Sequence, residues 1–259
     1  IDAVYIASPN ETHYEYARKA VNAGKHVLCE NPIALNKQDA AELFLLAEKH
    51  DVVILEGIKT AYCPGFQQLI NTARSGQIGE IRDIEACFTR LADPHARECT
   101  DARYGGAFLE YAAYTLLPIF KLFGTNYKEV KFHSIYRDDG LDLYTKIDLV
   151  YDQGMATAKC GVGVKTEGQL VISGSTGYLL AESPWWLTKK YKLRYEDPNK
   201  VETFEPKFQG DGLRYEMGEF VAQINKIGKN KYLLTQNEIM AMSEITEMFI
   251  RKRLKRESL

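Results

Sequence analysis

Two short apolar runs near the start of the chain constrain its fold more than any other feature. Residues 1–7 and 26–29 have the length and the partly β-branched composition of buried strands. Residues 11–23 between them predict a helix, for which Asn10 is a suitable N-cap and Gly24 a suitable end. A strand, a helix and a strand within about 30 residues predict a parallel βαβ unit with a right-handed crossover.

Polar residues follow both predicted strands. Ser8 and Pro9 come after the first strand, and Glu30, Asn31 and Pro32 come after the second. The carboxyl ends of parallel strands lie at one edge of a sheet, and ligands bind outside that edge in open α/β sheets. The sequence therefore predicts a ligand site there. Pro32 is also a residue type that accepts a cis peptide bond in a tight turn.

The alternation of strands and helices continues to residue 60 and then gives way to strands. Residues 37–50 predict an amphipathic helix over the sheet, and residues 52–56 predict the next parallel strand. From residue 81, partial alternation at period 2 predicts a mostly antiparallel sheet. The predicted strands are 81–90, 130–136, 143–150, 155–164, 169–173, 178–182 and 189–195. The further predicted helices are 66–74, 107–123, 213–227 and 236–254.

Composition narrows the class of protein. Of the 259 residues, 45% are apolar and 26% are charged, which is typical of a soluble globular protein. The net charge of −2 gives no bias toward nucleic acid or an anionic membrane. The five cysteines lack Cys-x-x-Cys spacing, which favours reduced thiols in a cytoplasm and predicts no metal site. No apolar run reaches the ~18 residues of a membrane span.

Several motifs stand in order between residues 2 and 114. They are Asp2 to His13 (DAVYIASPNETH), Ala20 to Val27 (AVNAGKHV), Glu30-x-Pro32, Gly76 to Ile81 (GQIGEI) and Gly105 to Tyr114 (GGAFLEYAAY). This set resembles the Gfo/Idh/MocA family, NAD(P)-dependent oxidoreductases that act mostly on sugars, inositols and related polyols. The resemblance implies an α/β part followed by an α+β part.

The implied domain organisation has three segments. Residues 1–60 would form the C-terminal part of a Rossmann dinucleotide-binding domain with a partial parallel sheet. Residues 61–234 would form an α+β substrate and dimerisation domain with a mostly antiparallel open sheet, through which two copies form a homodimer. Residues 235–259 would form a C-terminal helix that packs back on the Rossmann part.

The resemblance also implies roles for individual residues. The residues expected to bind NAD or NADP are Ser8, Pro9, Asn10, His13, Glu30, Asn31 and Pro32. Those expected at the chemistry are Tyr114, Glu110 and Asn31, with His95 and Tyr114 contacting a polyol or sugar-like substrate. Glu110 and Tyr114 are four residues apart in a predicted helix and therefore share one face.

One departure from the family pattern affects the chemistry directly. The family has Glu-Lys-Pro where this chain has Glu30-Asn31-Pro32, and a desolvated lysine suits proton transfer because its pKa falls on burial. The Asn31 amide has no titratable proton. Ala61 likewise stands where the family often has an arginine. These departures leave a second hypothesis open, a non-catalytic ligand-binding or regulatory relative.

Several assignments have a structural alternative. His13 either lines the cofactor edge or caps the helix, and Glu30 binds either a ribose hydroxyl or backbone amides of its turn. Tyr114 and its neighbour Tyr111 could simply pack and hydrogen-bond. His95 lies in a polar loop that is solvated by default.

Two other features have alternatives of the same kind. Trp185-Trp186 is either a sugar-stacking platform or packing at a sheet edge or dimer contact. The basic run 251–256 is a solvated last helical turn rather than a nucleic-acid site.

The chain opens inside a predicted strand, without a Gly-x-Gly-x-x-Gly turn. Such a turn normally holds the pyrophosphate at a helix N-terminus. We therefore expect the sequence to be a fragment of a longer protein, with about two strand–helix units before Ile1.

Overall fold

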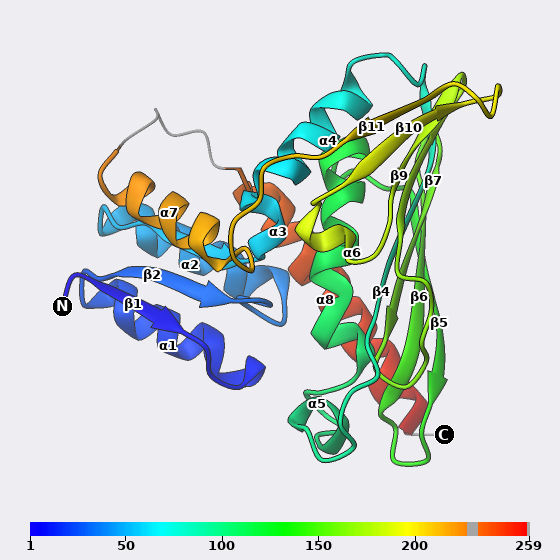
Figure 1. Cartoon of the computed structure of the whole chain (residues 1–259). Helices are drawn as coiled ribbons and strands as arrows, with labels where there is room; N and C mark the ends of the chain where they lie inside the picture. The colour runs from blue at the N-terminus through cyan, green and yellow to red at the C-terminus, as the bar shows by residue number, and fades with distance from the viewer. Residues whose placement is uncertain (227–232, 258–259) are drawn as a thin grey trace. The chain divides into compact units, whose positions relative to one another are not determined.

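The computed structural model describes residues 1–226 and 233–257 and contains two compact units (Figure 1). Unit 1 comprises Ile1–Tyr62 and Gly212–Leu259, and unit 2 comprises Cys63–Asp211. The division of the sequence into domains at residues 60 and 234 stays a prediction.

Unit 1 is built on a three-stranded parallel sheet in the order β1-β2-β3. The strands are β1 (Ala3–Ile6), β2 (His26–Glu30) and β3 (Ile54–Gly57). In the register of the sheet, Ile6 lies opposite Cys29, and Glu30 lies opposite Gly57. The three carboxyl ends therefore share one edge, which we call the carboxyl edge, and the predicted βαβ unit is confirmed.

Helices of unit 1 pack on this sheet or on one another. The helices of unit 1 are α1 (His13–Asn22), α2 (Lys37–Lys49), α3 (Lys59–Tyr62), α7 (Leu213–Ile224) and α8 (Gln236–Glu257). Asn36 caps α2 by accepting a hydrogen bond from the Asp39 amide at 2.8 Å. Phe220 of α7 packs against Leu28 and Leu55 of the sheet. The predicted helix end at Ile227 lies outside the described residues.

The first helix begins later than the sequence predicts. Asn10–Thr12 form a 3-10 turn (η1), and α1 starts at His13 with Thr12, not Asn10, at its N-cap. The Thr12 hydroxyl donates to the Pro9 carbonyl at 2.7 Å and lies 2.7 Å from the Ser8 hydroxyl. These contacts close the turn, so the prediction of Asn10 as the helix cap was wrong. Gly24 does end the helix region, with a φ of 67°.

Unit 2 contains an eight-stranded sheet in the order β11-β10-β9-β8-β4-β7-β6-β5. All neighbours pair antiparallel except β4 and β7, which are parallel, so the prediction of a mostly antiparallel sheet is confirmed. The strands are β4 (Ile81–Thr89), β5 (Glu129–Tyr136), β6 (Asp142–Val150), β7 (Met155–Gly161), β8 (Leu170–Gly174), β9 (Gly177–Ala181), β10 (Tyr191–Tyr195) and β11 (Val201–Phe204). The edge strand β11 was not predicted, because it has only four residues (VETF) and most of them are exposed.

The long helix α6 (Ala107–Phe123) covers one face of this sheet and matches its predicted bounds (Figure 1). It packs on β4, β6 and β7. In β6, Ile147 and Leu149 are fully buried, whereas Lys146 before them and Val150 after them are exposed. The face of the sheet opposite α6 is therefore more open. Shorter helices of unit 2 are α4 (Pro64–Arg74), α5 (Arg97–Thr100) and η2 (Trp185–Leu187).

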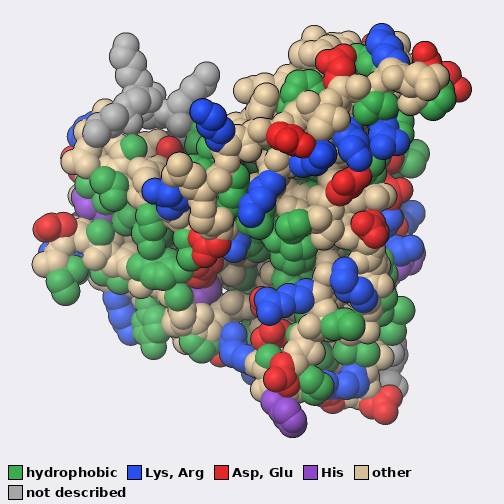
Figure 2. All heavy atoms as spheres, viewed as in Figure 1, with side chains coloured by type: hydrophobic (Ala, Val, Ile, Leu, Met, Phe, Trp, Pro, Cys, Tyr) green, Lys and Arg blue, Asp and Glu red, His purple; other side chains and the backbone are tan. Residues whose placement is uncertain are grey.

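Charged side chains of both signs are interspersed on the surface that Figure 2 shows. On β10 and its surroundings they form ion pairs, such as Lys192–Glu182 and Lys190–Glu205, each at 2.7 Å. At the end of α8, Arg251 bonds to Glu247, and the buried Arg253 lies over the Phe249 ring. The described helices include none long and apolar enough to cross a membrane.

Candidate functional site

Glu30 is the first polar side chain at the carboxyl edge of unit 1. It ends β2 and is partly buried, and its Oε1 accepts a hydrogen bond from the Tyr5 hydroxyl of β1. Burial raises the pKa of Tyr5, and the bond to Glu30 raises it further. The phenol therefore stays protonated and donates to the carboxylate. In the described part of the chain, Glu30 makes no hydrogen bond to the amides of its own turn. Its partner is the Tyr5 side chain on the neighbouring strand.

Asn31 turns toward the next strand. Its Nδ2 donates to the Gly57 carbonyl at the end of β3, at 2.8 Å, and the Asn31–Pro32 peptide bond is cis. A Cβ atom at position 57 would make a tight contact of 3.1 Å with Glu30 Oε2. The amide thus ties the two strand ends together and offers no titratable proton at the edge.

Glu56 supports the same turn from within the sheet. It is 1% exposed, and its Oε1 accepts a hydrogen bond from the Ile33 amide at 2.8 Å. Its other oxygen is buried with no hydrogen-bond partner in the described structure. Burial raises the pKa of Glu56 to about 7. The group therefore holds a proton over much of the acidic range and fixes the backbone after Pro32.

Glu216 of α7 is a second buried carboxyl group at this edge. It is 1% exposed, and neither oxygen has a hydrogen-bond partner in the described structure. Burial and then the charge of Glu30 raise the pKa of Glu216 to about 8, while the ammonium of Lys59 acts in the opposite direction. Phe220, one turn later, packs on mid-sheet residues. The N-terminal turn of α7 therefore lies over the carboxyl ends of the strands.

His13 links the two turns that follow β1 and β2. It is 1% exposed, with Nδ1 at 2.9 Å from the Pro32 carbonyl and Nε2 at 2.7 Å from the Ser8 carbonyl. The ring thus fixes the spacing between these turns. His13 is the first residue of α1 and is buried, and its predicted place at the cofactor edge stays a prediction. It supports the loops that carry Ser8 and Glu30.

The predicted residues of unit 2 lie at the start of α6. Glu110 is exposed in the first helical turn, and Tyr114 is partly buried one turn later. Tyr114 meets the Phe88 ring edge-on at 5.4 Å, while Tyr111 stacks on Phe88 at 4.3 Å. Burial raises the pKa of Tyr111. The packing alternative thus holds for Tyr111, and Tyr114 is the more accessible phenol.

The tryptophan pair packs within unit 2. Trp185 is fully buried, and its Nε1 donates to the Cys87 carbonyl at 2.7 Å. Trp186 stacks on Phe88 with ring centroids 3.7 Å apart. The packing interpretation is therefore the one that the structure supports. His95 is exposed, and its backbone amide bonds to Asp93 within the same loop, so its substrate role stays a prediction.

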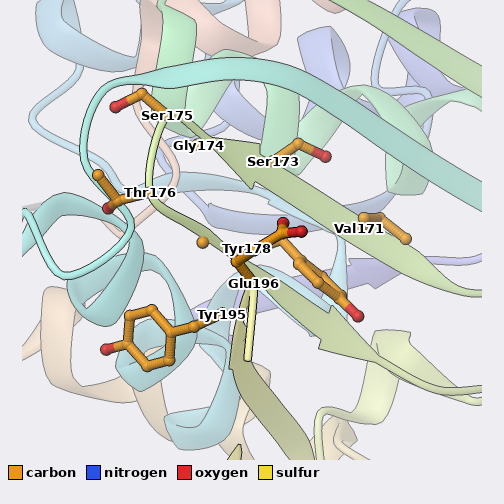
Figure 3. Close-up of a pocket in the computed structure, with 9 residues that line it drawn as sticks. Val171, Ser173, Gly174, Ser175, Thr176, Tyr178, Tyr195 and Glu196 are labelled. Carbon is orange, nitrogen blue, oxygen red and sulfur yellow. The ribbon is translucent and has the colours of Figure 1, made fainter. Parts of the chain in front are cut away.

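A pocket of about 480 Å³ lies elsewhere in unit 2, at the β8–β9 turn (Figure 3). The residues that line it include Ser173, Ser175, Thr176, Tyr178 and Glu196. None of the residues that the sequence predicted for the site lines it. The described residues also hold no group of three or more His, Cys, Asp or Glu side chains that could bind a metal.

The structure thus brings some predicted residues together and adds others. In unit 1, His13 joins the predicted Ser8 and Pro32 through their carbonyl groups, while Glu30 bonds to Tyr5 and Asn31 to Gly57. Sequence reasoning missed Tyr5, Glu56, Lys59 and Glu216 at the same edge. Glu56 could have been found from the sequence, because a carboxylate near the end of an apolar strand indicates a site at that edge. The position of Glu216 was not readable, because α7 is far away in sequence.

Comparison with known proteins gives a consistent result. The family described as "Oxidoreductase family, NAD-binding Rossmann fold" matches residues 1–58, and the "GFO/IDH/MocA C-terminal domain" matches residues 66–180. The scyllo-inositol 2-dehydrogenase (NADP(+)) of Bacillus subtilis is 28% identical over 233 residues, which cover 87% of this chain and 70% of that protein.

Two further similarities come from Actinomadura kijaniata. Its dTDP-3,4-didehydro-2,6-dideoxy-alpha-D-glucose 3-reductase is 34% identical over 121 residues, which cover 45% of this chain and 35% of that protein. The crystal structure of its 3-ketoreductase in complex with NADP and TDP-benzene superposes with a TM-score of 0.80 at 22% identity, over 95% of this chain and 77% of that one.

The similarities differ in reach. The shared fold covers nearly all of this chain, and the alignments span between about a third and 70% of these two curated relatives. Both domain models belong to one family and follow each other in the order that the sequence motifs predicted. The chain belongs to the Gfo/Idh/MocA family of oxidoreductases.

Proposed function

We propose that the protein is an NAD(P)-dependent oxidoreductase acting on a sugar, an inositol or a related polyol or carbonyl compound. The observation that carries the proposal is the match of both family domains together with a polar carboxyl edge on the parallel sheet. The relatives include an NADP-dependent inositol dehydrogenase and a sugar 3-reductase, which supports this substrate class.

The residues at the carboxyl edge suit part of a dinucleotide. Glu30 is a carboxylate fixed by Tyr5 at a strand's carboxyl end, and its oxygens can accept hydrogen bonds from ribose hydroxyls. The Ser8 hydroxyl and the turn at 9–12 provide further polar groups, held by His13. In this proposal Ser8, Pro9, Asn10, Glu30, Asn31 and Pro32 bind the cofactor and His13 positions their turns. The bound nicotinamide would supply or accept a hydride.

Side chains of the protein transfer the proton to or from the substrate oxygen. Alcohol oxidation removes the hydroxyl proton, and carbonyl reduction adds one. Asn31 can only orient a substrate by hydrogen bonding. In unit 2, Tyr114 is a candidate proton donor, Glu110 a candidate partner on the same helix face, and His95 a candidate substrate contact.

We also propose that the protein works as a cytoplasmic homodimer. The open face of the eight-stranded sheet supports the dimer, because it carries paired charges such as Lys159–Glu85 and exposed apolar residues such as Met155. The five free, buried cysteines support a reducing compartment.

A binding and turnover assay tests the proposed function. The protein is titrated with NAD, NADH, NADP and NADPH by calorimetry and then assayed against a panel of inositols, sugars and keto-sugars. We expect binding of at least one dinucleotide and turnover of at least one polyol or carbonyl compound. Absence of both would contradict the proposal.

Asn31 motivates the rival hypothesis of a non-catalytic, ligand-binding relative. The Asn31→Lys variant separates the two, because it restores the family's Glu-Lys-Pro sequence. An inert wild type together with an active Asn31→Lys variant would favour the rival. Turnover by the wild type would favour the oxidoreductase.

A further inference from the structure

Lys59 is a lysine at the corner of unit 1 where α3 packs against α7. It is the first residue of α3 and follows Gly57, the last residue of β3, by two positions. Its Cα therefore lies within about 7 Å of Gly57 Cα, given at most ~3.6 Å per residue. The Asn31 side chain bonds to the carbonyl of that same glycine at 2.8 Å. Lys59 and Asn31 thus belong to one corner of the sheet edge.

The backbone keeps Lys59 at this corner. The Ile58 amide donates to the Glu56 carbonyl at 3.0 Å, and the Ala61 amide donates to the Ile58 carbonyl at 2.8 Å. The Tyr62 hydroxyl returns to the Glu56 carbonyl at 2.7 Å. The chain therefore turns sharply at the strand end, and α3 cannot carry Lys59 away from the edge.

Glu216 is a buried carboxyl group on α7, the helix that packs against the α3 helix of Lys59. The buried carboxyl group of Glu216 has no hydrogen-bond partner in the described structure, and it senses the positive charge of Lys59. The charge of Glu30 also acts on Glu216 and raises the pKa of its carboxyl group. The side chain of Lys59 is itself only partly buried. A partly exposed ammonium with a buried acidic neighbour is a group that can reach a ligand and exchange a proton.

We propose that Lys59 is the catalytic proton-transfer residue of unit 1 and takes the role for which Asn31 has no titratable proton. This inference rests on the proposed oxidoreductase function. In carbonyl reduction an Nζ–H bond of Lys59 breaks and its proton forms the O–H bond of the product alcohol, while the carbonyl carbon gains a hydride from the reduced dinucleotide. Solvent returns the proton to the neutral amine. In alcohol oxidation the same bonds form and break in reverse. Glu216 is a positioning residue in this scheme.

The first test compares Lys59→Ala and Lys59→Met with Lys49→Ala, an exposed lysine on α2 that serves as the matched control. We expect kcat to fall by about 100-fold or more in both Lys59 variants, which is the usual contribution of a positioned acid or base. KM and dinucleotide affinity should stay near the wild-type values, and Lys49→Ala should leave all three unchanged. Added ethylamine should raise the kcat of Lys59→Ala, because it replaces the missing amine.

A compensating variant uses the shared corner. Placing lysine at position 31 in the Lys59→Ala protein should restore part of kcat, since both positions adjoin Gly57. A lysine that only stabilised the fold would show neither amine rescue nor compensation.

A labelling experiment on the wild-type protein does not depend on whether a variant folds. Acetylation of Lys59, followed by mass spectrometry of peptides, should slow when dinucleotide and substrate are both present, while acetylation of Lys49 should not change. Equal rates at Lys59, or a Lys59→Ala enzyme with kcat within about threefold of wild type, would overturn this inference alone. A wild type that binds no dinucleotide and turns over nothing would overturn the proposed function and this inference with it.

Discussion

At the scale of single residues, the carboxyl edge holds two carboxyl groups that are held away from water without full hydrogen bonding. Glu56 and Glu216 are both almost fully buried, and three of their four oxygens lack a hydrogen-bond partner in the described structure. Such groups are costly to ionise, and sites of this kind are common where proton chemistry occurs.

These two groups predict a pH dependence of stability. Their pKa values are raised from 4.5 to about 7 for Glu56 and about 8 for Glu216, so the folded protein binds more protons than the unfolded chain between these values. The contribution of these two groups to the free energy of unfolding should therefore be largest below about pH 4.5. It should fall as the pH rises toward 8. The limiting slope is about 1.4 kcal/mol per pH unit for each group.

Urea unfolding at pH 5, 6, 7 and 8 measures this slope. The Glu216→Gln variant should flatten it, because the amide does not ionise. Glu48→Gln, at an exposed glutamate of α2, is the control and should keep the wild-type slope. Identical slopes for wild type and Glu216→Gln would contradict the prediction.

The sequence was sufficient to find part of this edge and not the rest. Glu30 and Asn31 could be predicted because they directly follow a strand whose end is readable from local pattern. Tyr5 looked like an ordinary strand residue, and its bond to Glu30 depends on pairing between two strands. Glu216 depends on a helix that returns from far along the chain, which no local pattern encodes.

At the scale of elements, α6 depends on one buried side chain for its start. Asp142 is fully buried, and its Oδ2 accepts from the Phe108 amide in the first turn and from the Thr145 hydroxyl, both at 2.8 Å. Gly106 precedes the helix with a φ of 95°, and a Cβ atom there would come within 2.1 Å of Asp142 Oδ1. The carboxylate therefore caps a helix that has no capping side chain of its own.

Asp142→Ala should destabilise unit 2 by about 1–3 kcal/mol, the cost of leaving buried donors without their acceptor. Asp142→Asn keeps one acceptor oxygen and should cost less. Asp152→Ala removes an exposed carboxylate that pairs with Lys128, and should stay within about 0.5 kcal/mol of wild type. Chemical denaturation of the three variants makes the comparison, and equal midpoints for Asp142→Ala and Asp152→Ala would show that the cap is unimportant.

The element scale also shows why some helix starts are predictable. Asn36 precedes an amphipathic run and caps it locally, so α2 could be placed from sequence. Asn10 has the same residue type before a similar run, but the Thr12 and Ser8 hydroxyls close a 3-10 turn first. The competing side-chain bonds decide the outcome, and they are visible only in three dimensions.

At the scale of the whole molecule, the order of the two sheets could be predicted because each has its own sequence period. Continuous apolar runs marked the parallel strands, and alternation at period 2 marked the antiparallel ones. The parallel pairing of β4 with β7 could not be foreseen, because hairpin turns specify neighbours in sequence and this pair is separated by α6 and two strands.

The five cysteines are all buried as free thiols, so their rates of chemical modification measure how often the surrounding structure opens. Cys29 lies in unit 1, whereas the other four lie in unit 2. Burial raises the pKa of Cys29 and of Cys160, so a thiol reagent reacts with them only after the surrounding structure opens. The labelling rate of Cys29 therefore measures the opening of unit 1, and the labelling rate of Cys160 measures the opening of unit 2. If the units unfold independently, Cys29 and Cys160 will be modified at different rates in the same native sample, and peptide mass spectrometry will read both. A single shared rate would mean that the chain opens all at once.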